Sequence, residues 1–194
     1  MKIIIVRHGE TEANAKKIVQ GHSNIPLSEI GIAQAKKVAL RLKKERIDIA
    51  FCSDLPRARM TAEEIMKFHK APLVATKELR ERSHGIFENR HADEMKKYRE
   101  ERGIPRHVFR PEGGESFLDI EKRAGKFLSM IMKKYKEKNV LLVAHGGINR
   151  VLLSLLLKKP LEEAVDIEQK NTCVNIVEIS DGMKIHKINC TEHL

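Results

Sequence analysis

The sequence predicts a single α/β domain built around a mainly parallel β-sheet. Two short apolar runs, 3–6 and 140–144, lead into Arg-His-Gly and His-Gly-Gly respectively. Apolar runs of this length that end in polar groups are typical of buried parallel strands. In open α/β sheets, ligands bind at the carboxyl edge of such strands. Residues from the two ends of the sequence are therefore predicted to share one pocket.

Between these strands the predicted elements alternate in type. Four helices are predicted from apolar residues at helical spacing, and they begin after Ser28, Ser53, Ser116 and His145. Each run follows a capping residue or a glycine pair. Further strands are predicted at 47–52, at 73–75 and on both sides of Asp181-Gly182, a hairpin signal. Residues 11–26 have few apolar anchors and predict a loop. This alternation favours one α/β domain over separate units.

The length of 194 residues suits one domain with a sizeable core. Hydrophobic residues make up 41% and charged residues 33%, which excludes a disordered chain. Residues 81–115 differ from the rest because they combine charge, histidine, proline and a glycine pair, with only a weak helix at 95–101. We therefore expect a domain over 1–194 with a lid or specificity segment at 81–115.

The net charge of +10 favours an anionic partner. Aromatic residues are only 4% of the chain, which leaves few stacking platforms for nucleic acid, and the basic residues are scattered among acids. A small phosphorylated metabolite is thus favoured over nucleic acid or a membrane, and a homodimer stays open. The chain begins with a predicted core strand, and its three cysteines form no C-x-x-C pair, so we expect a cytoplasmic protein.

Five polar residues are predicted to meet at the carboxyl edge of the sheet. His8 ends the first strand beside Arg7, which opposes protonation of the imidazole and attracts anions. His145 precedes a helix whose first N–H groups favour an anion. Arg57 lies in the first turn of a helix, where a cation is unfavourable unless an anion compensates it. Glu81 follows the third predicted strand.

Each of these residues also has an ordinary structural interpretation. A histidine at a strand end can be a core residue that bonds a backbone carbonyl, and Glu81 alone could form an exposed ion pair. Arg59 is predicted to lie on the solvated face of its helix. His22, His84, His91 and His107 lie in loops that could border the site.

Taken together, the motifs resemble the histidine phosphatase superfamily, also called the phosphoglycerate mutase-like family. The resemblance covers essentially the whole chain and rests on ordered blocks: Arg7-His8-Gly9-Glu10-Thr11 with Asn14, Pro26-Leu27-Ser28 with Gly31 and Gln34-Ala35, Ser53-Asp54-Leu55 with Arg57-Ala58 and Thr61-Ala62, Glu81, Gly113-Gly114-Glu115-Ser116, and His145-Gly146.

The resemblance implies a three-layer αβα sandwich and phosphoryl transfer without a metal or other cofactor. By this resemblance, His8 becomes phosphohistidine, and Glu81 protonates the leaving oxygen and then activates water. Arg7, Arg57 and His145 would hold the phosphoryl oxygens. Further phosphate contacts are expected from residues near these strand ends: Thr11, Asn14, Gln20, Gly21 and Gly146. Such catalysis depends on positioning and positive charge.

Within the family, the sequence favours a phosphatase of the histidine acid type over a phosphoglycerate mutase. Mutases typically carry Trp where this chain has Ala13, Tyr where it has His84, and a lysine near the position of Ala92. The adjacent arginine pair of the mutase lid is missing. His84, Arg90, His107 and Arg110 give no defined clamp for a second anionic group. The expected substrate is a small phosphomonoester, and a mutase is the alternative.

Two other classes are less favoured. A phosphate-binding module without catalysis would keep the arginines but lose His8 or Glu81, and both are present. A nucleic-acid-binding protein would account for the charge but not for the lack of a basic tract, and salt-dependent retention on DNA would identify it.

Overall fold

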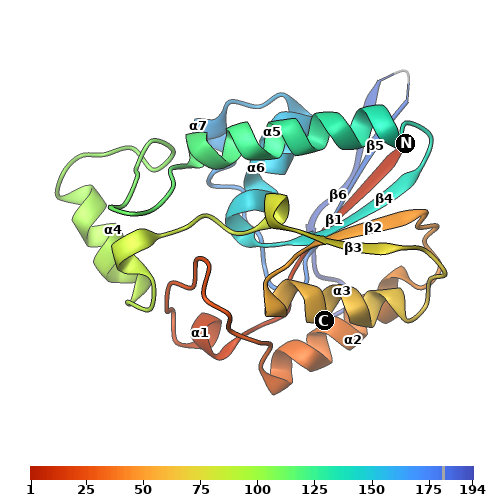
Figure 1. The fold of residues 1–194 in the computed structure, drawn as a ribbon, viewed down its shortest axis with the longest axis horizontal. Helices are drawn as coiled ribbons and strands as arrows, with labels where there is room; N and C mark the ends of the chain where they lie inside the picture. The colour runs from red at the N-terminus through yellow and green to blue at the C-terminus, as the bar shows by residue number, and fades with distance from the viewer. Residues whose placement is uncertain (181) are drawn as a thin grey trace.

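The computed structural model describes residues 1–180 and 182–194. In this part of the chain, six strands form one sheet (Figure 1). The strands lie side by side in this order: β3 (Leu73–Thr76), β2 (Ile49–Ser53), β4 (Asn139–Ala144), β1 (Lys2–Arg7), β5 (Val174–Ile179) and β6 (Met183–Cys190). The first four are parallel, whereas β5 and β6 run antiparallel to their neighbours. The predicted mainly parallel sheet is confirmed.

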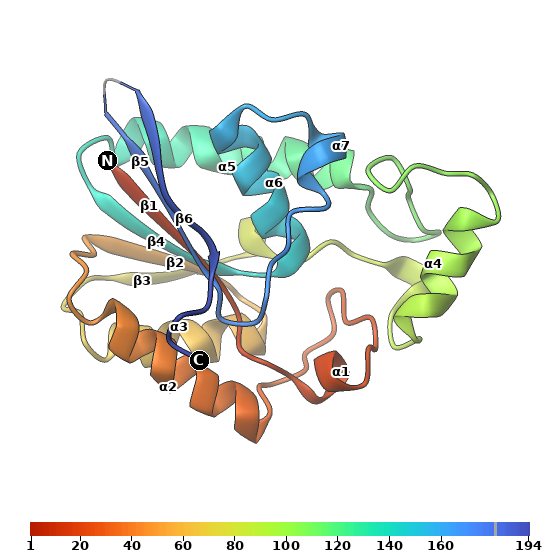
Figure 2. The ribbon, with the colours of Figure 1, turned by 180° about the vertical axis from the view of Figure 1, so that it is seen from behind.

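Helices flank the sheet on both faces (Figures 1 and 2). They are α1 (Glu12–Ala15), α2 (Glu29–Leu42), α3 (Pro56–Met66), α4 (Ala92–Glu100), α5 (Phe117–Lys134), α6 (Gly146–Leu157) and α7 (Leu161–Ala164), with 3₁₀ turns η1 (Lys77–Leu79) and η2 (Gly85–Phe87). Helices α5 and α6 cover one face, and α2 and α3 cover the other. The chain therefore has the three-layer αβα architecture that the resemblance implied.

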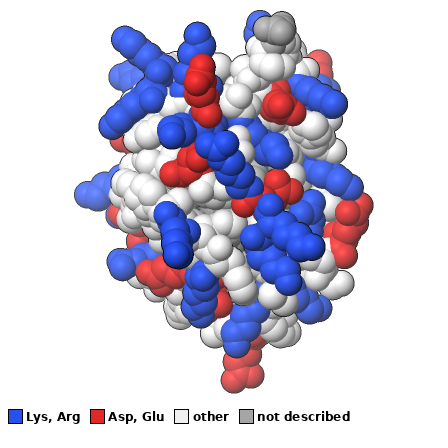
Figure 3. All heavy atoms as spheres, turned by 90° about the vertical axis from the view of Figure 1, so that its right-hand side faces the viewer, with Lys and Arg blue, Asp and Glu red and all other residues white. Residues whose placement is uncertain are grey.

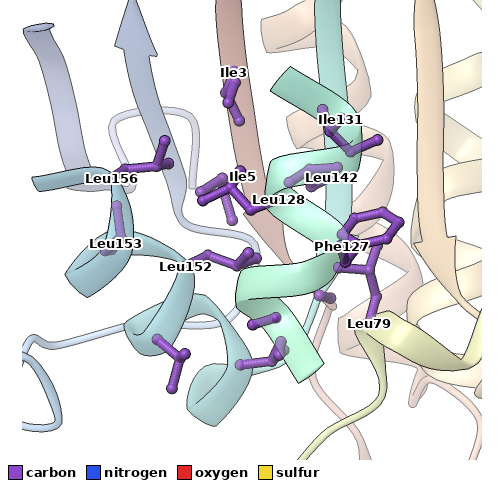
Figure 4. Close-up of a cluster of buried hydrophobic side chains, with 14 of the residues drawn as sticks. Ile3, Ile5, Leu79, Phe127, Leu128, Ile131, Leu142, Leu152, Leu153 and Leu156 are labelled. Atoms are coloured by element: carbon purple, nitrogen blue, oxygen red, sulfur yellow. The ribbon is translucent and has the colours of Figure 1, made fainter. Parts of the chain in front are cut away.

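Strand β1 is buried on both faces, so its side chains alternate between two hydrophobic cores. Ile3 and Ile5 pack with α5 and α6 (Figure 4), whereas Ile4 and Val6 pack with α2 and α3. All four side chains are fully buried. Burial on both faces explains why the strand is continuously apolar rather than alternating. The two cores fix β1 in place and thereby fix the position of His8 at its end.

Helix starts agree with the sequence at two of three capping positions. Ser28 caps α2 by accepting the Gly31 N–H, and Ser116 caps α5, where it forms a capping box with Asp119. The prediction that Ser53 caps α3 is wrong, because Ser53 still belongs to β2 and the helix begins at Pro56. Proline is suited to the first helical position because it has no N–H to satisfy.

Two loop predictions also need correction. The segment 11–26 contains the short helix α1, in which Thr11 and Asn14 form a capping box. Helix α4 spans Ala92–Glu100, so it begins three residues before the predicted 95–101. The late strands β5 and β6 pair as an antiparallel hairpin as predicted, and Asp181 of its turn lies outside the described residues.

Basic side chains are mixed with acidic ones over the face opposite the lid (Figure 3). This view agrees with the scattering of charge along the sequence. Within 1–180 and 182–194, no helix combines the length and the apolar character needed to cross a membrane. The cysteines Cys52, Cys173 and Cys190 are all free thiols.

Candidate active site

The loop after β1 is held tightly against α2 and α3, and this contact sets the position of His8. The Gly9 N–H donates to Thr61 Oγ1 at 3.1 Å, and Ser28 and Gln34 bond the backbone of Glu10. A side chain at Gly31 would meet the Glu10 carbonyl oxygen at 1.9 Å. Only glycine permits this approach, which accounts for a glycine in the first turn of α2.

His8 is positioned as a neutral nucleophile. Its side chain is 3% exposed, and Nδ1 lies 2.7 Å from the Gly9 carbonyl oxygen. A carbonyl only accepts, so Nδ1 carries the proton and the lone pair resides on Nε2. Burial lowers the pKa of His8 well below its ordinary value, and Arg57 and Arg7 lower it further. The imidazole therefore remains unprotonated at neutral pH.

His145 lies beside His8, although 137 residues separate them in the sequence. The two ring centroids are 5.1 Å apart in an edge-on arrangement. His145 is fully buried, and neither of its ring nitrogens has a partner among the described residues. Burial lowers its pKa well below the usual value, with Arg57 and His8 contributing. A buried ring nitrogen without a hydrogen-bond partner costs free energy of folding, so we interpret this ring as a ligand-binding group and not as an ordinary core residue.

Arg7 and Arg57 place two guanidinium groups at the same strand ends. Arg7 Nη1 donates to the Gln169 carbonyl at 2.6 Å, and Arg57 donates to the carbonyls of Gly21 and Ser23, both at 2.8 Å. The Nε atoms of both arginines are buried without a described partner. Arg57 is 1% exposed, and burial lowers its pKa to about 10, so it stays charged. These backbone carbonyls partly compensate the positive charge of Arg57, which is unfavourable in the first turn of a helix.

Glu81 reaches the site from the segment after β3. Its two carboxylate oxygens accept the N–H groups of Arg82 (2.8 Å) and Gly147 (2.9 Å). Burial by itself raises the pKa of Glu81, but the N–H groups of Gly147 and Arg82 and the nearby charges of His84 and Arg57 together outweigh it, so the pKa lies below its ordinary value. The carboxylate is thus ionised at neutral pH, and its use as an acid requires a bound anion that raises its proton affinity.

A small cavity of about 130 Å³ lies among these groups; His145 does not line it, and its ring lies behind that of His8, which does. Several residues predicted to contact the phosphate line it: Arg7, His8, Asn14, Gln20, Gly21, Arg57 and Glu81. Thr11 does not line it, because this residue is fully buried behind Asn14 and caps α1. Gly146 borders Arg7, and a side chain there would begin 3.6 Å from Arg7 Nε.

A further segment supports the site, and the sequence analysis did not identify it. Asn171 Nδ2 donates to the His8 carbonyl (3.1 Å) and to Asn14 Oδ1 (3.3 Å), while Gln169 supplies the acceptor for Arg7. Strand β5 is antiparallel to β1, so the residues just before it lie at the carboxyl edge of β1. The polar run 168–172, directly before an apolar strand, was the available signal.

Of the four loop histidines, two lie near the site. His84 lines the small cavity, and His22 Nε2 lies 2.9 Å from the Glu81 carbonyl oxygen. His91 caps α4 on the surface, and neither it nor His107 lines the cavity. In the described part of the chain, no cluster of three or more His, Cys, Asp or Glu is arranged to hold a metal ion.

His84 is expected to make the stability of the fold depend on pH. Burial and then Arg82 lower its pKa to about 3, whereas an unfolded histidine titrates near 6.5. Between about pH 3 and pH 6.5 the unfolded chain therefore binds one more proton at His84 than the folded protein does. The free energy of unfolding consequently decreases as the pH falls below about 6.5. In His84→Gln, the slope of unfolding free energy against pH should decrease by about 1.4 kcal/mol per pH unit between pH 6 and 4.

Urea unfolding at several pH values measures this slope. Parallel slopes for the wild type and the variant would show that His84 accepts a proton within the folded protein.

Comparison with known proteins shows the family to which a chain with this fold and this pair of histidines belongs. The family model of the histidine phosphatase superfamily (branch 1) matches residues 3–191, so the chain belongs to this superfamily.

Among its relatives is the adenosylcobalamin/alpha-ribazole phosphatase of Salmonella typhimurium, which is 31% identical over 97% of this chain and 95% of the relative. Phosphoglycerate mutase-like protein 4 of Arabidopsis thaliana is 36% identical, over 94% of this chain and 81% of the relative. The solved structure of the alpha-ribazole phosphatase from Shigella flexneri has a TM-score of 0.88 at 27% identity, and covers 98% of this chain and 96% of that one. The relatives thus include both phosphatases and mutase-like proteins.

Proposed function

We propose that the protein is a metal-independent phosphomonoesterase that acts on small phosphorylated metabolites through a phosphohistidine intermediate. The observation that carries the proposal is the neutral His8, with Nε2 free, in a small cavity lined by Arg7 and Arg57. His145, with two unpartnered nitrogens, lies directly beside it. Phosphoryl transfer requires a positioned nucleophile and fixed positive charge, and this site supplies both.

In the first step, His8 Nε2 attacks phosphorus and the bond from phosphorus to the ester oxygen breaks. Arg7, Arg57 and His145 hold the phosphoryl oxygens, and Glu81 gives a proton to the departing alcohol. The pKa of Glu81 lies below its ordinary value, so the carboxylate is ionised before substrate binds, and its proton arrives with the substrate, whose phosphate has a second pKa near 6. The bound phosphate then keeps that proton on the carboxylate.

In the second step, water attacks the phosphohistidine and the bond from phosphorus to Nε2 breaks. Glu81 takes a proton from the attacking water and gives it up with the departing inorganic phosphate, so that Glu81 is ionised and His8 is neutral again. The same carboxylate thus acts first as acid and then as base, which a single group that lines the cavity can do.

A phosphoglycerate mutase is the second candidate, and the identity to a mutase-like protein favours it. A mutase has to keep water from the phosphohistidine until a second hydroxyl arrives. The chain departs from the mutase pattern at Ala13 in α1 and at His84 and Ala92 in the segment 81–115, so we favour hydrolysis.

Release of inorganic phosphate in the presence of EDTA separates these possibilities. We expect phosphate release from several phosphomonoesters, including phenyl phosphate, with no specific gain from Mg²⁺ or Zn²⁺. Interconversion of 3- and 2-phosphoglycerate should be negligible. Efficient interconversion primed by 2,3-bisphosphoglycerate, with little phosphate released, would favour the mutase, and loss of activity on chelation with rescue by a metal would contradict the site assignment.

A further inference from the structure

A second, larger cavity opens beside the phosphate site. Its volume is about 530 Å³, and it shares Glu81 and His84 with the small cavity. Its walls come from the lid, from α4 and from the start of α6. Figure 1 shows α4 beyond the ends of the central strands, on the side where β1 ends. A group bonded to a phosphoryl group at His8 would therefore extend past Glu81 into this cavity.

The lining of the larger cavity carries an excess of positive charge. Five basic residues contribute to it: Arg82, Lys96, Arg99, Arg106 and Arg150. Three acidic residues accompany them, and one of these is the proposed acid Glu81. The other two, Asp93 and Asp166, have side chains 76% and 73% exposed, so solvent screens their attraction to the basic side chains of the cavity.

The basic residues differ in how firmly they are already engaged. Arg82 has a structural role, because it donates to the Phe109 carbonyl and lies over the Phe117 ring. Arg99 pairs with Glu100, and Arg106 pairs with Asp166, both at the surface. Pairs of this exposed kind contribute little and exchange readily. Arg99 and Arg106 are therefore available to a ligand.

Arg150 and Lys96 have no ion pair among residues 1–180 and 182–194. The Nε atom of Arg150 donates to the Ile167 carbonyl at 2.8 Å, which fixes the guanidinium at the cavity wall. Burial, followed by repulsion from Arg106, lowers the pKa of Arg150 to about 10. The group stays charged at neutral pH, and its neighbours disfavour that charge. An anion between Arg106 and Arg150 would relieve this repulsion.

We propose that this cavity binds the alcohol portion of the substrate and selects phosphomonoesters that carry a second anionic group. The selected group is a carboxylate or a further phosphate, held mainly by Arg106 and Arg150 with Lys96. The cavity volume accommodates an alcohol of about the size of a sugar. This inference rests on the proposed phosphatase function and narrows its substrate class.

Two matched pairs of substrates test the inference. 6-Phosphogluconate differs from glucose 6-phosphate by a carboxylate, and fructose 1,6-bisphosphate differs from fructose 6-phosphate by a phosphate. For at least one pair we expect a kcat/KM about tenfold higher or more for the member with the additional anionic group. This is the factor that one charged hydrogen bond to that group would contribute. The pair that shows the larger ratio identifies the preferred anion.

Substitutions of the basic residues test whether the cavity causes that preference. Arg150→Gln and Arg106→Gln should each lower the ratio within the preferred pair by about tenfold, and Lys96→Gln by less. Lys97→Gln is the matched control, because Lys97 neighbours Lys96 on α4 but pairs with Glu101 outside the cavity, and it should leave the ratio unchanged. If Arg150→Gln does not fold, the partly exposed Arg106 still provides the test.

The outcomes distinguish this inference from the function on which it rests. Equal kcat/KM within both pairs, with phenyl phosphate hydrolysed, would overturn the anion-selective cavity and leave the phosphatase intact. An unchanged ratio in both arginine variants would also overturn it. Failure to release phosphate from any ester, phenyl phosphate included, would overturn the proposed function itself.

Discussion

Replacement of His8 by alanine is expected to lower turnover by at least about 10³-fold, because the proposed reaction loses its nucleophile. The wild type should form an acid-labile phosphohistidine at His8, which rapid quenching with labelled substrate and peptide mapping detect. The variant should remain folded, since among the described residues the ring bonds only the adjacent Gly9 carbonyl, and His8 directly follows a strand that two cores fix in place.

His186→Ala is the matched control, because His186 lies on the terminal hairpin and pairs with Glu178 at the surface. It should retain turnover and labelling. Label on a residue other than His8, or full activity in His8→Ala, would contradict the mechanism.

Replacement of Arg57 by alanine should lower kcat/KM by about tenfold or more for each charged hydrogen bond lost to the phosphoryl group. Arg57 is 1% exposed and lines the small cavity, and it also fixes the loop through Gly21 and Ser23. Arg57→Lys keeps the charge but loses the planar fork, so it should recover only part of the loss.

Arg59→Ala provides the comparison within the same helix. Its side chain is 62% exposed and pairs with Glu63, as predicted for a solvated face. Steady-state kinetics should show a change of less than about twofold, the effect of losing an exposed ion pair. Equal losses at Arg57 and Arg59 would show that the wrong arginine, or the wrong face of α3, has been assigned.

The parts of the fold that could be predicted are those in which local pattern and burial agree. The runs 3–6 and 140–144 are apolar because two helical layers cover them, and their ends mark the functional edge. At Ser53 the local pattern and the fold disagree. A serine shortly before a helix is a favourable N-cap, but here Ser53 pairs with β3 and so remains part of β2. Pairing between strands that are distant in the sequence sets such a boundary, and a local sequence pattern cannot predict that pairing.

The site divides in a similar way. His8, Arg7, Arg57, Glu81 and His145 could be selected because each follows or ends a strand. Asn171 and Gln169 could not be selected without the knowledge that β5 runs antiparallel. The basic lining of the larger cavity was also hidden, because Arg106 and Arg150 are 44 positions apart and meet only when the lid folds over α6.

The lid itself is more ordered than its glycines and prolines indicated. Phe87, Tyr98 and Phe109 pack as a small aromatic cluster, with ring centroids 5.2–6.3 Å apart. Aromatic contacts of this kind add stability beyond the area they bury. The segment 81–115 therefore has a small core of its own, which holds the basic side chains in place.

The central position of β1 has a consequence for the way in which the chain folds. This strand is synthesised before the other five, yet its two neighbours in the sheet, β4 and β5, come more than 130 residues later. At about 5–20 residues per second, the ribosome leaves the run Ile3–Val6 without its partners for on the order of ten seconds. Pairing over such sequence separations is intrinsically slow. An apolar segment that waits this long is a natural target for chaperones, and the catalytic histidine at its end acquires its environment only in the final stage of folding.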